Sequence, residues 1–552
     1  MRSFKLAFLL VCLILMLSGL QDAFGANAYI LLWNSVKVDV KGSILWTNRS
    51  LIRVEEPLTF PKYLSWKYDS AKSELTIEKL RIRRTDGRVE LLALDVKEYG
   101  EFVEKRANLE NLKPGDIIDI SFSFRRESPL PPYFWWYFPN CGEMDIKKLH
   151  LEVTSPGGFV SNESLSSGLL EREDIYAIDP FSPPKEPILL TSLPSWDRAY
   201  PLFSIPEGNF PIAELERRLS KVPGSRGKVE LIWKILSERK KVLEGWAFSD
   251  QGYRFSPLKE IWERDKVTPS DFSFLAYHML KGIGLSPEMV WVSEWPLSEK
   301  YPVPSLLKYP ILKVVVEDKT YWLDPYALGL PAGYIHPKFQ GGKGVIFYSN
   351  GAKFVDLPVM GENLSSENID LVIDLYPNGS YDFSVNAIAR GWLVPQLDRL
   401  RQFEGVSDVS FENKGYALIG KLKGKGKIVM DGFERKLVIT LPQIGFPLDF
   451  LSLSLRRSYP INLGFLRSFD HQIILRYPKE WKVKALPLPL SRDEGAFSIS
   501  ARFSSGIRNR LTLSYSFKLK KRVLSPEEWA SLIKVLSTLE DYIKGHILFE
   551  GK

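Results

Sequence analysis

Residues 268–324 constrain the fold of this chain more than any other stretch, because they carry the signals of a helix followed by two strands. Thr268 and Pro269 mark the helix start, since a threonine hydroxyl can cap free N–H groups and proline has no N–H to leave unpaired. Gly284 marks its end. Between them, apolar side chains recur every three or four residues and predict one buried face, formed by Phe272, Leu275, Ala276, Met279, Leu280 and Ile283.

Two β-rich segments follow this helix. Residues 288–292 and 311–316 are rich in β-branched and other apolar side chains, and the second turns at 317–320 into the sequence YWLDP at 321–325. This order of elements resembles the transglutaminase-like, papain-like fold of bacterial cell-envelope proteins. The resemblance implies an α+β domain, which in the tripartite members of the family lies between two β-rich domains.

Members of that family carry a Cys–His–Asp site, and the resemblance implies where its parts fall here. A helix N-terminus and a nearby imidazole lower the pKa of a thiol, so that thiolate is present near neutral pH. Counting back from Gly284, the Cys position falls at Pro269 or Ser270. Asp271 matches an acid that the family often carries just after its Cys.

The remaining two positions are located from the end of the second strand. Counting back from Asp324, the His position falls at Pro310 or Ile311. The Asp position is kept as Asp324, which in the family holds the imidazole in its useful tautomer. The resemblance therefore implies a degenerate site without its nucleophile and its base. An ordinary strand-ending turn is the alternative interpretation of Asp324-Pro325, because both residue types favour turns.

Ser270 is a candidate for a different nucleophile, provided that a base lies within hydrogen-bond reach. His278 is too distant for this role, because eight residues of helix place it about 12 Å away at a rise of ~1.5 Å per residue. The base would have to come from a distant loop, such as that of His336. An acyl hydrolase or peptidase is therefore the alternative to a non-catalytic domain.

Residues 1–25 predict a secretory signal peptide. Arg2 and Lys5 precede an apolar run at 6–17, and small residues lie just before Ala26. The run is short for a bilayer span, although an uncleaved membrane anchor is the alternative. Because no second long apolar run follows, we expect an exported protein without a transmembrane span, in the periplasm, at the cell surface or outside the cell.

One cysteine remains after the signal segment. Cys141 follows an aromatic stretch and has no helix start beside it, which favours a buried free thiol over a nucleophile. A single thiol makes neither an internal disulfide nor a thiolate metal cluster. The five histidines are scattered, and no glycine-rich phosphate loop follows a strand, so we expect neither a metal nor an organic cofactor.

Residues 26–205 predict an N-terminal β-sandwich, because short strands alternate with turn signals. Six consecutive aromatic residues at 133–138 are bracketed by prolines. Because proline lacks a ladder N–H, the whole run is not expected to be strand interior, and packing of its aromatic surface on a neighbouring domain is favoured. The order of RIRRTDGR, LENLKPGDIIDISF and LHLEVTSPGG resembles the β-rich domain that precedes the transglutaminase-like domain in the same family. The strands are expected at 29–33, 35–40, 75–84, 89–94, 116–124 and 148–155.

Residues 206–340 form the transglutaminase-like domain in this interpretation. Helices are expected at 211–220 and 228–241, the second with one apolar face. The sequence YRFSPLKEIW resembles the loop that leads to the Cys helix in the family, and it would form one wall of a cleft. Core packing accounts for about half of the aromatic residues near such a site. The others would line a binding groove, whose candidate residues are Tyr253, Phe255, Trp291, Trp295, Trp322 and Asp324.

Residues 341–552 predict a second antiparallel β-sandwich that ends in a helix. A hairpin at 369–385 turns at Pro377-Asn378-Gly379-Ser380, and a capping box at Ser525 starts a terminal helix whose apolar face must pack on something. The sequence RRSYPINLG resembles the C-terminal domain of the tripartite family. Further elements are expected as a short helix at 395–403 and strands at 416–430, 436–441, 471–477 and 511–519.

The formal charge of +8 permits adhesion to anionic envelope polymers, although acids and bases are interspersed along the chain. Lysines concentrate only at 421–427, where a solvated hairpin is favoured over nucleic-acid binding because no aromatic platform accompanies them. The leading interpretation is an exported, non-catalytic protein whose transglutaminase-like domain lies between two β-sandwiches and binds a polypeptide or glycan of the cell envelope. A purely structural envelope protein is a further alternative.

Overall fold

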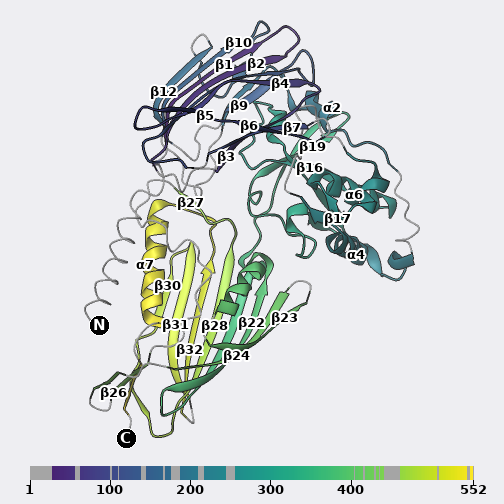
Figure 1. Ribbon diagram of the computed structural model, residues 1–552. Coiled ribbons are helices and arrows are strands. Elements are labelled where there is room, and N and C mark those ends of the chain that lie inside the picture. The colour runs from purple at the N-terminus through teal and green to yellow at the C-terminus, as the bar shows by residue number, and fades with distance from the viewer. Residues whose placement is uncertain are drawn as a thin grey trace. The chain divides into compact units, whose positions relative to one another are not determined.

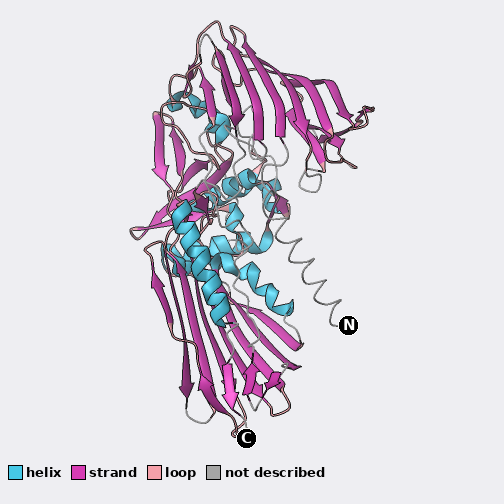
Figure 2. Cartoon of the chain, turned by 90° about the vertical axis from the view of Figure 1, so that its left-hand side faces the viewer, coloured by secondary structure: helices cyan, strands magenta, loops and turns pink. Residues whose placement is uncertain are grey.

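Strands are the commonest element of the described chain, and helices are concentrated in the central segment and near the C-terminus (Figure 1, Figure 2). The expected signal peptide, Cys141 and Tyr253 lie outside the described residues, as does most of the expected helix at 211–220. The computed structural model describes residues 28–55, 62–99, 102–109, 111–138, 145–165, 168–175, 187–208, 217–243, 255–402, 405–414, 417–427, 431–433, 436–439, 460–506, 509–543 and 547–550.

The chain divides into two compact units. The first unit contains Met1–Tyr326 and Gly341–Leu357, and the second contains Ala327–Gln340 and Pro358–Lys552. The chain therefore leaves the first unit, contributes one short segment to the second, returns, and then completes the second unit.

A seven-stranded sheet forms the N-terminal part of the first unit, in the order β12-β10-β1-β2-β8-β4-β5 (Figure 1). Its outward and inward side chains alternate along strands such as β2, as expected for a sheet with one face on a core. The strands are β1 (Ala28–Val38), β2 (Ile44–Arg53), β4 (Ser73–Arg83), β5 (Val89–Leu91), β8 (Ile117–Arg126), β10 (Asp145–Thr154) and β12 (Leu169–Ile175).

Two three-stranded sheets, β11-β13-β9 and β3-β7-β6, pack on the seven-stranded sheet. One hydrophobic cluster joins that sheet to β9 and β13, a second joins it to β3 and β7, and Trp46 and Trp136 pack against both clusters. This part of the molecule is thus layered β structure, as the strand and turn pattern predicts. The added strands are β3 (Tyr63–Asp69), β6 (Leu94–Tyr99), β7 (Phe102–Asn108), β9 (Trp135–Phe138), β11 (Val160–Ser161) and β13 (Ile188–Thr191).

Two details of the N-terminal prediction are wrong. The strands expected at 29–33 and 35–40 form one strand, β1, because the side-chain oxygen of Asn34 accepts hydrogen bonds from Trp46 Nε1 at 2.9 Å and Asn48 Nδ2 at 2.8 Å inside the core. The expected all-antiparallel pattern fails where β1 pairs with β10 in parallel. β10 returns to β1 only after a long excursion of the chain, so no tight turn fixes their relative direction.

A five-stranded sheet follows in the first unit, in the order β18-β17-β16-β19-β20. Of the two expected strands, the one at 288–292 is found with the same bounds, and the one at 311–316 begins two residues earlier. The strands are β16 (Glu288–Val292), β17 (Tyr309–Val316), β18 (Lys319–Leu323), β19 (Lys343–Tyr348) and β20 (Gly351–Asp356).

Three helices belong to the same part of the chain as this sheet (Figure 1). They are α4 (Gly224–Arg239), α5 (Leu258–Glu263) and α6 (Pro269–Gly282). The expected start of α6 is confirmed, because Thr268 Oγ1 accepts a hydrogen bond from the N–H of Asp271 at 3.1 Å. Gly284 follows the helix with a φ of +81°, a backbone conformation that glycine adopts without strain.

The second unit is built on an eight-stranded sheet in the order β23-β24-β22-β21-β28-β32-β31-β30. Here too one pair, β21 with β28, is parallel, so the expected all-antiparallel sheet is wrong at this point. The strands are β21 (Ser366–Leu375), β22 (Ser380–Arg390), β23 (Val406–Asn413), β24 (Ala417–Lys427), β28 (Arg467–Arg476), β30 (Leu490–Asp493), β31 (Phe497–Gly506) and β32 (Arg510–Leu519).

The terminal helix α7 (Pro526–Ile543) lies beside β31 (Figure 1). Its predicted capping box is confirmed: the N–H of Ser525 donates to Glu528 Oε2 at 2.8 Å, and the N–H of Glu528 donates to Ser525 Oγ at 3.2 Å. Trp529, on the apolar face of this helix, is fully buried, so the face is covered as the sequence predicts. No helix of the described chain is both long and apolar enough to cross a membrane.

Candidate functional site

The first turn of α6 is closed off from solvent. Ser270 is 3 % exposed and Asp271 is 6 % exposed. The Asp271 carboxylate accepts hydrogen bonds from Ser256 through both the backbone N–H, at 2.9 Å, and the hydroxyl, at 3.1 Å. Asp271 therefore ties the segment before α5 to the start of α6. This explains structurally why an acid stands at the third position of the helix.

A second hydrogen bond joins α6 to the sheet. Ser273 Oγ donates to the backbone oxygen of Pro310 at 2.7 Å, and Ser273 is 1 % exposed. Two places that the sequence singled out separately, the helix start and the beginning of β17, are thus held side by side.

The pairing of β17 with β18 separates the two candidate His positions. Leu312 pairs with Leu323, so continuing the register by one residue sets Ile311 opposite Asp324. Pro310 pairs with Trp291 on the other neighbouring strand, β16. Successive side chains of a strand point to opposite faces. Ile311 is therefore the candidate on the same face of the sheet as Asp324, and Pro310 is on the other face.

Asp324 follows the last residue of β18 and has no exposed surface. Its Oδ1 accepts a hydrogen bond from the N–H of Tyr326 at 2.9 Å, which is the geometry of an Asx-turn. The turn interpretation of Asp324-Pro325 therefore has a physical basis in this structure. Because Ser270 is buried as well, neither side chain opens onto a solvent-filled cleft.

The expected groove residues are distributed between core and surface. Trp291 is 1 % exposed and Trp322 is 7 % exposed, so both belong to the core of the sheet. Phe255 is half-buried and stacks on Phe274 with ring centroids 4.4 Å apart. Trp295 is half-buried, in the loop between β16 and β17. Of the described candidates, Phe255 and Trp295 alone retain a partly exposed ring.

Tyr309 was not a candidate in the sequence, but it lies next to Pro310 at the start of β17. It is the first residue of β17, is half-buried, and pairs with Val292 across the sheet. Its ring lies 5.5 Å from that of Tyr326 at an angle of 79°. Burial, reinforced by the Glu294 carboxylate, raises the pKa of Tyr309, so the hydroxyl stays protonated at neutral pH.

A third tyrosine comes from the N-terminal part of the unit. β9 contacts the short helix η3 (Pro304–Leu306), and the Nζ atom of Lys308 lies 5.6 Å from the ring centroid of Tyr137 on β9. We name Tyr137, Tyr309 and Tyr326 the tyrosine cluster. The signal available in the sequence was the pair of strands expected at 288–292 and 311–316. When two such strands pair, the ends of the loop between them come together, and here Val292 pairs with Tyr309. Nothing local in the sequence points to Tyr137.

The histidines weighed as bases lie in other environments. His278 is 4 % exposed with Nε2 at 3.2 Å from the backbone oxygen of Pro206, and burial lowers the pKa of its imidazole. His336 belongs to the second unit, where its ring lies 5.1 Å from that of Trp392. Among the described residues, no three side chains of His, Cys, Asp or Glu are grouped to hold a metal ion.

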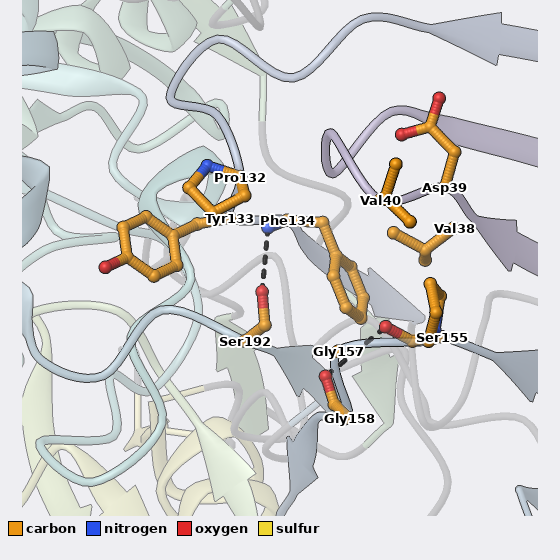
Figure 3. A pocket seen from close by; sticks show the side chains of 11 residues that line it. Val38, Asp39, Val40, Pro132, Tyr133, Phe134, Ser155, Gly157, Gly158 and Ser192 are labelled. Carbon is orange, nitrogen blue, oxygen red and sulfur yellow. Dashed lines mark hydrogen bonds between the residues drawn. The ribbon is translucent and has the colours of Figure 1, made fainter.

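A separate cavity of about 350 Å³ lies at one end of the N-terminal layers, with the buried ring of Phe134 among its lining side chains (Figure 3). Its polar groups bond to one another: the N–H of Phe134 donates to Ser192 Oγ at 3.0 Å, and Ser155 Oγ donates to the backbone oxygen of Gly158 at 3.3 Å. None of the candidate site residues lines it. The lining is Val38, Asp39, Val40, Pro132, Tyr133, Phe134, Ser155, Pro156, Gly157, Gly158 and Ser192.

Comparison with known proteins relates the chain to others at the level of fold. Residues 440–549 match a family described as a domain of unknown function with a solved structure, DUF3858. A crystal structure of a "putative protease" from Parabacteroides distasonis superposes with a TM-score of 0.62 at 14 % identity, covering 95 % of this chain and 99 % of that one. At this identity the likeness shows a shared multidomain fold and nothing about activity.

Yeast LTA4 hydrolase also matches, with a TM-score of 0.18 and 11 % identity over 46 % of this chain and 43 % of that one, which supports no argument. No curated protein matches the sequence.

Proposed function

We propose that this protein is an exported, non-catalytic transglutaminase-like protein that binds an extended polypeptide of the cell envelope at the junction of α6, β17 and β18. The observation that supports this most is that polar groups around the start of α6 already form hydrogen bonds within the scaffold. The Ser273 hydroxyl donates to Pro310, and the Ser256 hydroxyl donates to Asp271. These groups hold the scaffold together.

The strand order favours a polypeptide over a glycan as the ligand. β18 is the edge strand of the five-stranded sheet and leads directly to Asp324 and the tyrosine cluster. An edge strand offers backbone N–H and C=O groups to which an extended chain can add as a further strand. The half-buried aromatic rings beside it then supply side-chain contacts.

Covalent labelling tests the absence of catalysis. The intact protein is treated with a serine-directed fluorophosphonate and with a thiol alkylator, and the products are mapped by mass spectrometry. We expect no stoichiometric label at Ser270, because that residue is 3 % exposed and the strand residue bonded to its helix is Pro310, which is not a base. Stoichiometric labelling of Ser270 or Cys141 would favour the acyl hydrolase or peptidase interpretation instead.

A direct assay complements the labelling. Hydrolysis or cross-linking of a peptide amide by the purified protein, lost in an Asp324→Asn variant that remains folded, would overturn the proposal. Binding of envelope polypeptides and of glycans to the intact protein is compared in the same experiment. We expect polypeptides to bind, and a preference for glycans would contradict the edge-strand argument.

A further inference from the structure

The seven-stranded sheet of the first unit has one face on the two hydrophobic clusters and another that points away from them. In β4, Leu80 and Ile82 belong to the second of these clusters. Successive side chains of a strand point to opposite faces, so the intervening Lys79, Arg81 and Arg83 point away from the core. Three successive outward positions of this strand are therefore cations.

Strand pairing places further cations and aliphatic side chains beside these three. Residues paired across neighbouring antiparallel strands lie on the same face, with Cβ atoms about 5 Å apart. The outward residues of β2, β8, β4 and β5 therefore form three rows. In strand order, the rows are Arg53–Ile117–Arg83–Val89, Leu51–Asp119–Arg81–Leu91 and Arg49–Ser121–Lys79. We name the residues of these three rows the basic face.

One carboxylate lies in the middle row of the basic face and has no exposed surface. Asp119 Oδ2 accepts hydrogen bonds from Arg81 Nε at 2.9 Å and from Arg83 Nη2 at 2.6 Å. The side chains of these two arginines keep 27 % and 43 % of their surface exposed. Because one buried carboxylate is shared by two guanidinium groups, a net positive charge remains at the surface and its position is fixed.

Two exposed acids also lie near the basic face. Glu78, at the bulge of β4, accepts a hydrogen bond from the Ser121 hydroxyl at 3.0 Å. Glu55 has its carboxylate 3.7 Å from the guanidinium of Arg53. Together with Asp119 these are three carboxylates, against the five cations of the three rows. The basic face therefore carries an excess of positive charge, which attracts an anionic partner.

Exposed aliphatic side chains lie beside the arginines at the edge of the sheet. Leu91 is 79 % exposed and pairs with Arg81, and Val89 is 54 % exposed and pairs with Arg83. Both belong to β5, the edge strand. Aliphatic side chains next to cations suit the boundary between anionic lipid headgroups and acyl chains. A soluble polyanion would contact the cations and leave the aliphatic groups in water.

We propose that the basic face binds the surface of a membrane that contains anionic lipids, with its cations at the headgroups and Leu91 and Val89 at the acyl boundary. This surface belongs to the N-terminal sheet, whereas polypeptide binding is proposed at α6, β17 and β18. The inference therefore goes beyond the proposed function, and either one can fail without the other.

The test uses the chain without residues 1–25, because the apolar run at 6–17 could itself enter a bilayer. Cosedimentation is measured with vesicles of phosphatidylcholine alone and with vesicles that also contain phosphatidylglycerol. We expect the anionic vesicles to bind about tenfold or more tightly, and this preference to shrink as salt rises from about 0.1 M to about 0.5 M. Equal binding to both vesicles, or binding to neither, would overturn the inference. Binding of soluble inorganic polyphosphate without binding of vesicles would overturn it as well.

Two variants locate the binding surface. Arg49→Gln combined with Lys79→Gln removes two cations of the basic face and keeps both hydrogen-bond donors of Asp119. We expect this double variant to bind the anionic vesicles about twentyfold more weakly, at about fivefold for each cation. Leu91→Ser keeps every charge and is expected to weaken binding about threefold, because it removes an aliphatic contact with the acyl boundary.

The matched control is Lys421→Gln combined with Lys423→Gln, which removes the same charge from exposed positions of β24 in the second unit. We expect this control to bind within about twofold of the natural protein. Circular dichroism establishes that each variant is folded. A loss in the control equal to that of the Arg49 and Lys79 variant would show that overall charge, and not the basic face, binds the vesicles. Unchanged binding by Leu91→Ser would contradict the contact with the acyl boundary.

Discussion

Proline stands at two of the four positions where the resemblance places a nucleophile or a base, and both prolines suit their local backbone. Pro269 is the first residue of α6, where no N–H is required. Pro310 is the second residue of β17, and pairing with β18 begins only at Leu312, so its missing N–H removes no hydrogen bond on that side. Both prolines therefore fit the scaffold at positions where the resemblance places a reactive group.

The second unit contains a fully buried polar triad. His471 Nε2 lies 2.9 Å from Glu367 Oε1, and His471 Nδ1 lies 3.0 Å from the hydroxyl of Tyr515. Each of the three is at most 1 % exposed. We expect Glu367→Ala to destabilise the second unit by about 3–5 kcal/mol, because it leaves a buried imidazole without its partner. Urea denaturation measures the loss in the free energy of unfolding. Hydrogen exchange of the amides of β21 and β28, measured separately, shows whether the loss falls on this part of the sheet.

A triple replacement serves as the control for that variant. Glu367→Met with His471→Leu and Tyr515→Phe removes every member of the triad and leaves no unpaired polar group. Apolar replacement of a whole buried network is close to neutral in other proteins. A triple variant as unstable as Glu367→Ala would show that packing, and not the broken pair, causes the loss.

Glu288 on β16 predicts a dependence of stability on pH. Burial acts to raise the pKa of this carboxyl, but hydrogen bonds from Lys313 at 2.7 Å and from Tyr348 at 2.5 Å hold it below its usual value. A lowered folded pKa contributes stability above the ordinary glutamate pKa of about 4.3, and the contribution is lost as pH falls through the folded value.

We therefore expect Glu288→Gln to be less stable than the natural protein at pH 7 and to approach it at pH 3. The urea midpoints of the two proteins at both pH values measure the difference. A difference that stays constant with pH would mean that the Glu288 side chain acts through packing alone.

At the scale of elements, α6 depends on its first turn. Thr268→Ala removes the acceptor of the Asp271 N–H and is expected to destabilise the helix start by about 1 kcal/mol. Hydrogen exchange of the first-turn amides of α6 measures the change. Thr268→Ser keeps the hydroxyl and should exchange like the natural protein. Equal exchange in the alanine variant would show that the Ser256–Asp271 bonds suffice to hold the turn.

The lysine-rich stretch at 421–427 forms the end of β24, where exposed and buried residues alternate. In β24 the lysines at 421, 423 and 425 are exposed, and they alternate with buried Leu422 and Gly424. A side chain at Gly424 would come within 2.4 Å of the Phe383 ring, so glycine makes space for an aromatic neighbour on the core face. The expected solvated lysine face is thereby found, in a strand of the eight-stranded sheet.

At the scale of the whole molecule, Gly341–Leu357 returns to the first unit and is predicted to be needed for its folding. β19 pairs with β16, and Phe347 of β19 stacks on Phe203 with centroids 4.4 Å apart. We expect a chain that ends at residue 357 to keep a cooperatively folded first unit. A chain that ends at residue 340 should not, because it leaves Phe203 and the edge of β16 uncovered.

Far-UV circular dichroism and cooperative urea unfolding of the two truncated chains measure this. Equal cooperativity in both would mean that β19 and β20 are dispensable for the first unit. The full chain, which contains both segments in place, is the reference.

The sequence by itself determined the local elements of this protein. The bounds of β16, the caps of α6 and α7, and the apolar face of α7 follow from neighbours within about one helical turn or one hairpin, and the structure confirms them. Tertiary packing decided the rest: it buries Asp324 and Trp291, and it brings Tyr137 to the loop of Lys308. Such contacts depend on how distant layers meet, and no local pattern of residues encodes that.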